Sequence, residues 1–187
     1  MFSLHWNLQG HCLKVRALLQ YYVIMVTAIC RSRSGGMFKL LFLSGEHEVN
    51  IRTAGEASYP DECCGVLMGD IDDEGNKIVK RTQAINNAGE DGEKYHRFLI
   101  TPEDMLHAEQ TARAAKMEVI GFYHSHPDCP AAASDYDRDH ALPFYSYAIV
   151  SVEKGKSKEL LSWELSTDRT VFSPEKIEQI SNNKEDA

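Results

Sequence analysis

The sequence contains no pair of cysteines in a C-x-x-C arrangement, and its number of cysteines is odd. The five are Cys12, Cys30, Cys63, Cys64 and Cys129. Neighbouring residues on a strand point to opposite faces, so Cys63 and Cys64 are poorly placed to hold one metal ion together. The pattern disfavours a disulfide framework and is typical of free thiols in a reducing compartment. We therefore predict a cytoplasmic protein.

A hydrophobic run long enough to span a membrane is also missing. The longest apolar segment, Ala17–Cys30, is interrupted by Gln20 and Thr27, and it is shorter than the ~20 residues that a spanning helix needs. We predict that residues 1–36 are an N-terminal extension of the folded domain. Two interpretations stay open: Met37 is the true start and the preceding residues are translated upstream sequence, or the segment is a weak signal-like sequence.

Basic residues are scarce relative to acidic ones. The chain has 20 Lys and Arg against 28 Asp and Glu, a net charge of −8. Residues 1–36 hold four basic side chains and no acidic one, so the rest of the chain carries −12. Because such a surface repels phosphate backbones, the composition argues against a nucleic-acid-binding protein. The hydrophobic and charged contents, 43% and 26%, are those of an ordinary globular protein. We predict one domain over residues 37–175, followed by a charged tail over 176–187.

The order of predicted elements is mixed, without regular βαβ alternation. Hydrophobic periodicity and turn residues predict strands over residues 37–43, 63–69, 77–85, 97–100, 118–126, 145–153 and 159–165. Helices are predicted over residues 44–59, 101–115 and 134–142, where Ser44 opens the first and Thr101 caps the second. This order predicts an α+β fold with a curved mixed β-sheet flanked by helices.

Two histidines separated by one serine lie at the end of the predicted strand 118–126. Period two places His124 and His126 on one face of that strand, where they can share a zinc ion at roughly 2.0–2.1 Å. Ser134 and Asp137 open a predicted helix one loop later, so their side chains can face back towards the strand end. Two imidazoles and one carboxylate form the open three-ligand set that is typical of catalytic zinc.

Each part of this pattern also has a simpler structural interpretation. Ser134 and Asp137 by themselves make a good helix N-cap. Cys129 could be a ligand, although nothing requires it. His140 could orient a ligand or lie on the helix surface, and His96 is a candidate for substrate contact from a loop. The joint spacing H-x-H-x7-S-x2-D after an apolar strand favours catalysis over these separate explanations.

With this spacing the sequence resembles the JAMM (MPN+) zinc metallopeptidases. The residues that match the motif are His124, Ser125, His126, Pro127, Ser134 and Asp137. The segment YPDECCGVLMG, residues 59–69, is similar to the family's glutamate segment, which implies that Glu62 is the catalytic glutamate. The resemblance covers about residues 38–175 and is closest to the compact bacterial members. It implies an MPN/JAB-like fold.

The resemblance also implies a role for each residue of the site. His124, His126 and Asp137 would hold one zinc ion per chain, which lowers the pKa of bound water from about 15.7 towards roughly 7. Glu62 would take the proton of that water and later pass it to the leaving amine. Ser134 would donate a hydrogen bond to the carbonyl oxygen as that oxygen gains charge.

The implied substrate is a peptide or isopeptide bond at the C-terminal end of a ubiquitin-like protein. The interval between Glu62 and His124 leaves little room for the large insertions by which eukaryotic deubiquitinases recognise linked ubiquitin. We therefore expect a small ubiquitin-like sulfur carrier protein ending in Gly-Gly, or its C-terminal adduct, as the partner, and neither nucleic acid nor a membrane. The alternatives are a non-catalytic MPN scaffold and a zinc-binding interaction module.

Overall fold

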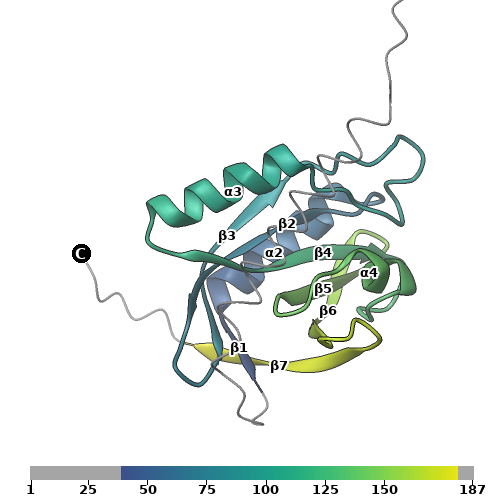
Figure 1. The fold of residues 1–187 in the computed structure, drawn as a ribbon. Helices are drawn as coiled ribbons and strands as arrows, with labels where there is room; N and C mark the ends of the chain where they lie inside the picture. Colours follow the sequence, from purple (N-terminus) through teal and green to yellow (C-terminus); the bar gives the residue numbers. More distant parts are fainter. Residues whose placement is uncertain (1–38, 181–187) are drawn as a thin grey trace, which may run out of the picture. The chain divides into compact units, whose positions relative to one another are not determined.

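The computed structural model describes residues 39–180, so the predicted extension over 1–36 and residues 181–187 lie outside the described part. Within it, the strands form a closed barrel in the order β1-β3-β2-β4-β5-β6-β7 (Figure 1). The strands are β1 (Leu40–Ser44), β2 (Cys64–Ile71), β3 (Lys77–Ile85), β4 (Glu118–Pro127), β5 (Ser146–Glu153), β6 (Lys156–Leu165) and β7 (Phe172–Ile180). The helices are α2 (Gly45–Ser58), α3 (Pro102–Ala114) and α4 (Asp135–His140). The predicted α+β class is confirmed, and the curved mixed sheet closes on itself.

The barrel closes through β1, which pairs in parallel with both β3 and β7. Strand β7 extends to Ile180, beyond residue 175, where we predicted the domain to end and a charged tail to begin. The side chain that β7 buries is the charged Glu175, whose carboxylate lies 3.3 Å from Lys77 Nζ and accepts a hydrogen bond from Ser162 Oγ at 2.6 Å. Because a buried ion pair takes the place of an apolar side chain, β7 lacks the hydrophobic alternation that reveals a strand.

The strand predicted at residues 97–100 is wrong, because this stretch is part of a loop over residues 86–101. Its backbone bonds to a side chain instead of a neighbouring strand. Asn87 Nδ2 donates to the carbonyl of Arg97 at 2.9 Å, and the amide of Leu99 donates to Asn87 Oδ1 at 3.1 Å. Together with the amide of Ala88, which donates to the carbonyl of Leu99 at 3.0 Å, this asparagine satisfies groups that a sheet ladder would otherwise satisfy.

Helix α2 begins after Ser44, which caps it by accepting a hydrogen bond from the amide of His47, as predicted. The helix buries Ile51 in the core of the barrel. At Gly55 it comes so close to β5 that a Cβ atom would lie 3.0 Å from the side chain of Val152 and 3.3 Å from that of Ser125. This contact packs α2 directly against the ends of β5 and of β4, the strand that carries the two histidines.

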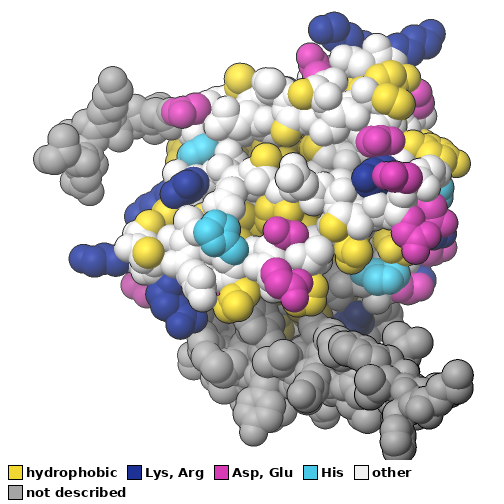
Figure 2. All heavy atoms as spheres, turned by 90° about the horizontal axis from the view of Figure 1, so that it is seen from above, with side chains coloured by type: hydrophobic (Ala, Val, Ile, Leu, Met, Phe, Trp, Pro, Cys, Tyr) yellow, Lys and Arg dark blue, Asp and Glu magenta, His cyan; other side chains and the backbone are white. Residues whose placement is uncertain are grey.

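Strand β4 lies between two partners, antiparallel to β2 and parallel to β5. Helix α3 packs on β4 and β2, and it buries Ala108 and Ala112. Figure 2 looks onto the side of the molecule where α3 lies, and acidic, basic and apolar side chains are interspersed on that face. None of the helices within residues 39–180 is long and apolar enough to cross a membrane.

Candidate metal centre

The end of β4 buries two imidazoles next to each other. The side chain of His124 is fully buried and that of His126 is 9% exposed. Both residues are held in register by β5, with His124 opposite Ile149 and His126 opposite Ser151. Their Nε2 atoms lie 3.0 Å apart, so the strand alternation places both rings on one face, as the spacing predicts.

Helix α4 brings a carboxylate to the same point. Asp137 lies in its first turn and is buried, with Oδ1 3.3 Å from His124 Nε2 and Oδ2 3.7 Å from His126 Nε2. One ligand atom from each of the three residues lies within 4.8 Å of the other two, and they form a group that could hold a metal ion. The structure therefore brings together the three residues that the sequence motif selects.

The ring of His126 is oriented by the loop that follows β4. Its Nδ1 lies 2.8 Å from the carbonyl oxygen of Pro130. Since a carbonyl only accepts hydrogen bonds, Nδ1 must carry the proton, and Nε2 is left to face Asp137. The loop is itself fixed by Trp163, whose Nε1 donates to the carbonyl of Ala131 at 2.9 Å. Burial alone would lower the pKa of His126, but Asp137 and the Pro130 carbonyl raise it above its usual value.

The ring of His124 is held by packing. Phe98, from the 86–101 loop, stacks on it with ring centroids 4.6 Å apart. Its Nδ1 is buried and has no hydrogen-bond partner within the described residues, in contrast to Nδ1 of His126. Burial lowers the pKa of His124 to about 4, so its imidazole is neutral at pH 7, which is the form that binds a metal.

Ser134 and Asp137 form a complete capping box at the start of α4. The backbone amide and the hydroxyl of Ser134 each donate to Asp137 Oδ2 at 2.7 Å, and the amide of Asp137 donates to Ser134 Oγ at 3.1 Å. Burial would raise the pKa of Asp137, but hydrogen bonds with His126 and Ser134 hold it well below its usual range. The simpler N-cap interpretation is therefore compatible with a metal-binding role for Asp137, because the cap fixes the carboxylate that faces the histidines.

The two imidazole nitrogens and the Asp137 carboxylate lie close enough together to share one tetrahedral zinc ion, with each nitrogen nearest to a different carboxylate oxygen. Ligands on such an ion at about 2.0–2.1 Å lie roughly 3.3–3.4 Å from one another. The separations between the two imidazole nitrogens and the carboxylate oxygens are 3.0, 3.3 and 3.7 Å. Two neutral nitrogen donors and one oxygen donor also leave a fourth position, as in catalytic zinc sites.

Glu62 is positioned by hydrogen bonds between its neighbour Cys63 and Ser125, the serine between the two histidines. Ser125 is fully buried on the opposite side of β4, and its Oγ accepts a hydrogen bond from the amide of Cys63 at 2.8 Å. The amide of Ser125 donates in return to the carbonyl of Cys63 at 3.2 Å. These bonds continue the β2–β4 pairing one residue beyond Cys64, and so they hold Glu62 beside the end of β4.

The carboxyl group of Glu62 is buried in the wall of a hollow. The side chain is 6% exposed, and burial raises the pKa of Glu62 to about 8, while His126 lowers it and Asp137 raises it further. The hollow has a volume of about 270 Å³. Its lining residues are Glu62, Tyr95, His96, His126, Pro127, Cys129, Pro130, Ala132, Ser134, Tyr136 and Asp137.

The remaining sequence candidates lie in different places. His96 and Cys129 line the hollow, although Cys129 is not in the group of three possible ligands. His140 is exposed and stacks on Tyr136 with centroids 4.1 Å apart, so it lies on the helix surface and does not orient a ligand. Sequence reasoning missed Phe98, since the stretch that contains it resembles a strand and a ring contact leaves no local signal.

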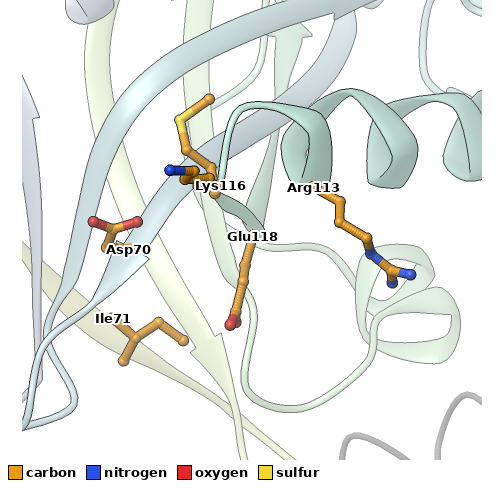
Figure 3. A pocket seen from close by; sticks show the side chains of 6 residues that line it. Asp70, Ile71, Arg113, Lys116 and Glu118 are labelled. Atoms are coloured by element: carbon orange, nitrogen blue, oxygen red, sulfur yellow. The ribbon is translucent and has the colours of Figure 1, made fainter.

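A second and larger hollow lies elsewhere on the domain. It has a volume of about 480 Å³, and its lining residues are Asp70, Ile71, Arg113, Lys116, Met117 and Glu118. Figure 3 shows that the side chains of Arg113 and Lys116 point away from each other. Arg113, Lys116 and Glu118 are exposed, and Asp70 forms an ion pair with Lys80 at 2.5 Å. These charges do not converge on a common point.

Comparison with known proteins gives the same assignment as the motif. Residues 45–166, more than half of the chain, match the family described as prokaryotic homologs of the JAB domain. A curated protein from Haloferax volcanii named Desampylase is 34% identical over 93 residues, which are 49% of this chain and 63% of that protein. A second Desampylase, from Pyrococcus furiosus, is 31% identical over 110 residues, 59% of this chain and 71% of that protein. The match thus spans less than two thirds of the Haloferax protein.

Solved structures share the fold. A protein from Desulfitobacterium hafniense has a TM-score of 0.68 and 25% identity, and the match covers 78% of this chain and 96% of that one. A protein from Salinibacter ruber has a TM-score of 0.60 and 32% identity, over 77% of this chain and 93% of that one. The resemblance to the JAMM family that the sequence motif carries is confirmed by the family match. This chain belongs to the prokaryotic homologs of the JAB domain.

Proposed function

We propose that the protein is a zinc-dependent metallopeptidase that hydrolyses a peptide or isopeptide bond at the C-terminal end of a small ubiquitin-like sulfur carrier protein. The observation that carries the proposal is the convergence of His124, His126 and Asp137 on one point, where His126 and Asp137 line the same hollow as the buried Glu62. The similarity to two proteins named Desampylase supports a hydrolase of this class. The buried, unpaired Cys63 and Cys64 thiols are consistent with a cytoplasmic site of action.

The metal would be held by two imidazole Nε2 atoms and the Asp137 carboxylate, with one zinc ion per chain. When bound, zinc supplies a Lewis-acid centre that activates water near neutral pH. The protein prepares these ligands in advance. Pro130 fixes the tautomer of His126, Phe98 fixes the ring of His124, and the capping box fixes the carboxylate. Such support from surrounding groups typically decides how well a site binds its metal.

Glu62 is the proposed proton carrier. A general base and acid works best when its pKa lies near the working pH, and burial raises the pKa of Glu62 to about 8, far above that of an exposed carboxyl. Opposite charge nearby favours the carboxylate, so a cation at the three ligands would bring this value down towards neutrality. Glu62 would take a proton from water and deliver it to the leaving amine from the same position in the wall.

Ser134 is the proposed hydrogen-bond donor to the substrate carbonyl. Its hydroxyl lines the hollow and donates to Asp137 Oδ2, an oxygen that also receives the Ser134 amide. The amide keeps the cap when the hydroxyl turns towards a substrate oxygen that gains negative charge. A donor of this kind is worth about 10²–10³ in rate.

The proposal is tested with a ubiquitin-like carrier whose terminal Gly-Gly is extended by one amino acid. The wild-type protein loaded with zinc should release that amino acid. Glu62→Gln should bind one equivalent of zinc and fail to cut, because the amide cannot carry the proton. Asp61→Asn is the matched control, since Asp61 is the exposed neighbour and does not line the hollow. Equal cutting by the wild type and Glu62→Gln would overturn the role of Glu62.

The two non-catalytic alternatives predict different results in the same experiment. A scaffold without activity would bind no zinc and would release no amino acid from the extended carrier. A zinc-binding interaction module would hold one zinc and release nothing from any extended carrier. Zinc content measured beside turnover therefore separates the three functions.

A further inference from the structure

The loop that follows β4 is held at its first residue by a carboxylate. Asp128, two residues after His126, has a φ angle of 52°, which lies in the left-handed region that aspartate tolerates better than most residues. We propose that Asp128 is a positioning residue for the metal centre, which holds the carbonyl of Pro130 against the ring of His126. This inference rests on the zinc site of the proposed function, and it concerns a residue to which neither the motif nor the proposed function assigns a role.

The carboxylate of Asp128 joins two other parts of the chain. Its Oδ2 accepts a hydrogen bond from the hydroxyl of Tyr59 at 2.8 Å, and its Oδ1 accepts one from the amide of Lys154 at 2.9 Å. The amide of Asp128 donates to the carbonyl of Val152 at 2.8 Å. Tyr59 is the C-cap residue of α2, and Lys154 lies in the turn between β5 and β6. The start of the loop is therefore bonded both to a helix end and to a hairpin.

Both partners of the carboxylate are themselves fixed. Lys154 and Gly155 have φ angles of 50° and 77°, and positive values at both central residues are what a tight type I′ hairpin turn requires. A Cβ atom on Gly155 would lie 3.7 Å from Cδ1 of Tyr59, so the tyrosine ring lies against this turn. Tyr59 also packs against the core of the barrel. The two donors thus offer Asp128 a rigid point of attachment.

The position of the Pro130 carbonyl depends on this attachment. Pro130 follows Asp128 by two residues, and its oxygen lies 2.8 Å from His126 Nδ1. The next residue, Ala131, is bonded to Trp163 Nε1 at 2.9 Å. The carbonyl that orients the ring therefore lies between two anchors, and the Asp128 carboxylate is the anchor on the β4 side. Without it, the loop populates positions in which this carbonyl leaves the ring, and the apparent metal affinity falls with the fraction of molecules that keep the contact.

The experiment removes the carboxylate and keeps the backbone conformation. Asp128→Gly should raise the Kd for zinc by about tenfold, since loss of a group that supports a ligand typically costs 10–100-fold and glycine adopts a positive φ without strain. Asp128→Asn should keep the wild-type Kd, because its amide oxygen accepts from Lys154 and its amide nitrogen donates to the Tyr59 hydroxyl. Tyr59→Phe removes one of the two bonds and should raise the Kd by about threefold. Competition with a chelating indicator measures each Kd.

A spectroscopic measurement separates positioning from a general loss of stability. In metal-free protein, at a pH above the titration of His126, the Pro130 carbonyl should keep the ring in its Nδ1-protonated form. Nitrogen NMR of the imidazole distinguishes this form from the Nε2-protonated one. Asp128→Gly should shift the population towards the Nε2-protonated form, and Asp128→Asn should not.

Asp72→Gly is the matched control. Asp72 Oδ1 accepts from the amides of Glu74 and Asn76 at 2.9 and 2.8 Å, in the turn between β2 and β3. This turn follows the end of β2 that lies away from the pairing of Cys64 with His124. The control should lose stability in urea unfolding much as Asp128→Gly does, and it should keep the wild-type Kd for zinc and the wild-type tautomer.

A wild-type Kd and tautomer in Asp128→Gly would overturn the role of Asp128 and leave the proposed function standing. Equal losses of zinc affinity in Asp128→Gly and Asp72→Gly, or an Asp128→Asn variant as weak as Asp128→Gly, would overturn it as well. If Asp128→Gly does not fold, Tyr59→Phe decides, and a wild-type Kd in that variant contradicts the proposal. If wild type binds no zinc, the proposed function fails, and the tautomer in metal-free protein then decides the role of Asp128 by itself.

Discussion

The two hollows described above differ in how deeply their charged groups are buried, and the smaller hollow has the more buried ones. The larger one, about 480 Å³, is lined by exposed charges, of which Asp70 pairs with a lysine outside the hollow (Figure 3). The smaller one, about 270 Å³, is lined by buried Glu62 and Asp137 and by His126. Water screens the first set of charges, while burial leaves the second set to interact strongly.

Burial is the reason why we place the proposed chemistry in the smaller hollow. A buried carboxyl group is costly unless it is paired or protonated, so a protein keeps such groups only where other interactions hold them. Here the strand pairing of β4, the cap of α4 and the Ser125 bonds hold three titratable groups together. The exposed charges of the larger hollow have no comparable constraint, and the contrast between the two regions can be tested residue by residue.

The largest effect is expected from a proposed metal ligand next to the smaller hollow. His124→Ala should remove zinc from the purified protein and lower turnover of the extended carrier by on the order of 10³-fold or more, because metal and proton transfer act as a unit. Metal analysis and steady-state kinetics measure both. Asp70→Asn in the larger hollow is the control and should change neither. The comparison breaks if His124→Ala keeps its zinc, or if Asp70→Asn loses activity to the same extent.

The next effect separates capping from catalysis. Helix α3 begins with a similar cap to α4, since Thr101 Oγ1 donates to Asp104 Oδ2 at 2.7 Å and accepts from its amide at 3.1 Å, although of these two caps the additional bond from the N-cap amide is made only at Ser134. Ser134→Ala and Thr101→Ala should each cost about 1 kcal/mol of stability. Ser134→Ala alone should also lower kcat by about 10²–10³. Equal losses of stability with unchanged kcat in both would reduce Ser134 to a helix cap.

This pair of caps also shows what the sequence could and could not reveal. Both Ser134 and Thr101 are predictable as N-caps, because a hydroxyl before an acidic first turn is a local signal. The sequence could also place His124 and His126 on one face, because strand alternation is local too. That the carboxylate of Asp137 reaches both rings depends on a loop whose shape is set by Trp163 and the carbonyl of Ala131, which lie 32 residues apart.

The fold was predictable where side chains alternate or cap, and it was not where a long-range bond replaces a local pattern. Strand β3 runs over Lys77–Ile85 as predicted, because the hydrophobic pattern that indicates it lies within the strand itself. Strand β7 was missed because buried Glu175 depends on Lys77, 98 residues away. The stretch at 97–100 has the apolar composition of a strand, and the hydrogen bonds of Asn87 that hold it as a loop leave no signal in that composition.

The pH dependence of stability should report the buried carboxyl directly. In metal-free protein the pKa of Glu62 is about 8, against 4.5 in the unfolded chain. Between these values only the folded state keeps the proton, so this group's contribution is complete below pH 4.5 and is lost as pH rises to about 8. His124 acts in the opposite sense, since its pKa falls from 6.5 to about 4 and stability is lost as pH falls through that range.

Glu62→Gln isolates the first of these two contributions. Relative to wild type, the metal-free variant should gain roughly 2–5 kcal/mol between pH 4.5 and pH 8, because glutamine stays neutral throughout. Urea unfolding of both proteins at several pH values gives the difference, and the contribution of His124 largely cancels in it. Parallel curves for the two proteins would mean that the Glu62 carboxyl is not buried in solution.

The smallest effect is expected from the larger hollow, and it is the sharpest check on the argument from burial. Arg113→Gln and Glu118→Gln remove exposed charges whose side chains do not converge with the others there (Figure 3). Surface changes of this kind alter stability by about 0.5 kcal/mol or less, and salt screens what remains. Both variants should therefore match wild type in urea unfolding, zinc content and kcat/KM for the extended carrier. A loss of several-fold in kcat/KM with a normal zinc content would show that the carrier contacts this hollow as well. The volume of a hollow would then indicate the binding site better than the burial of its charges does.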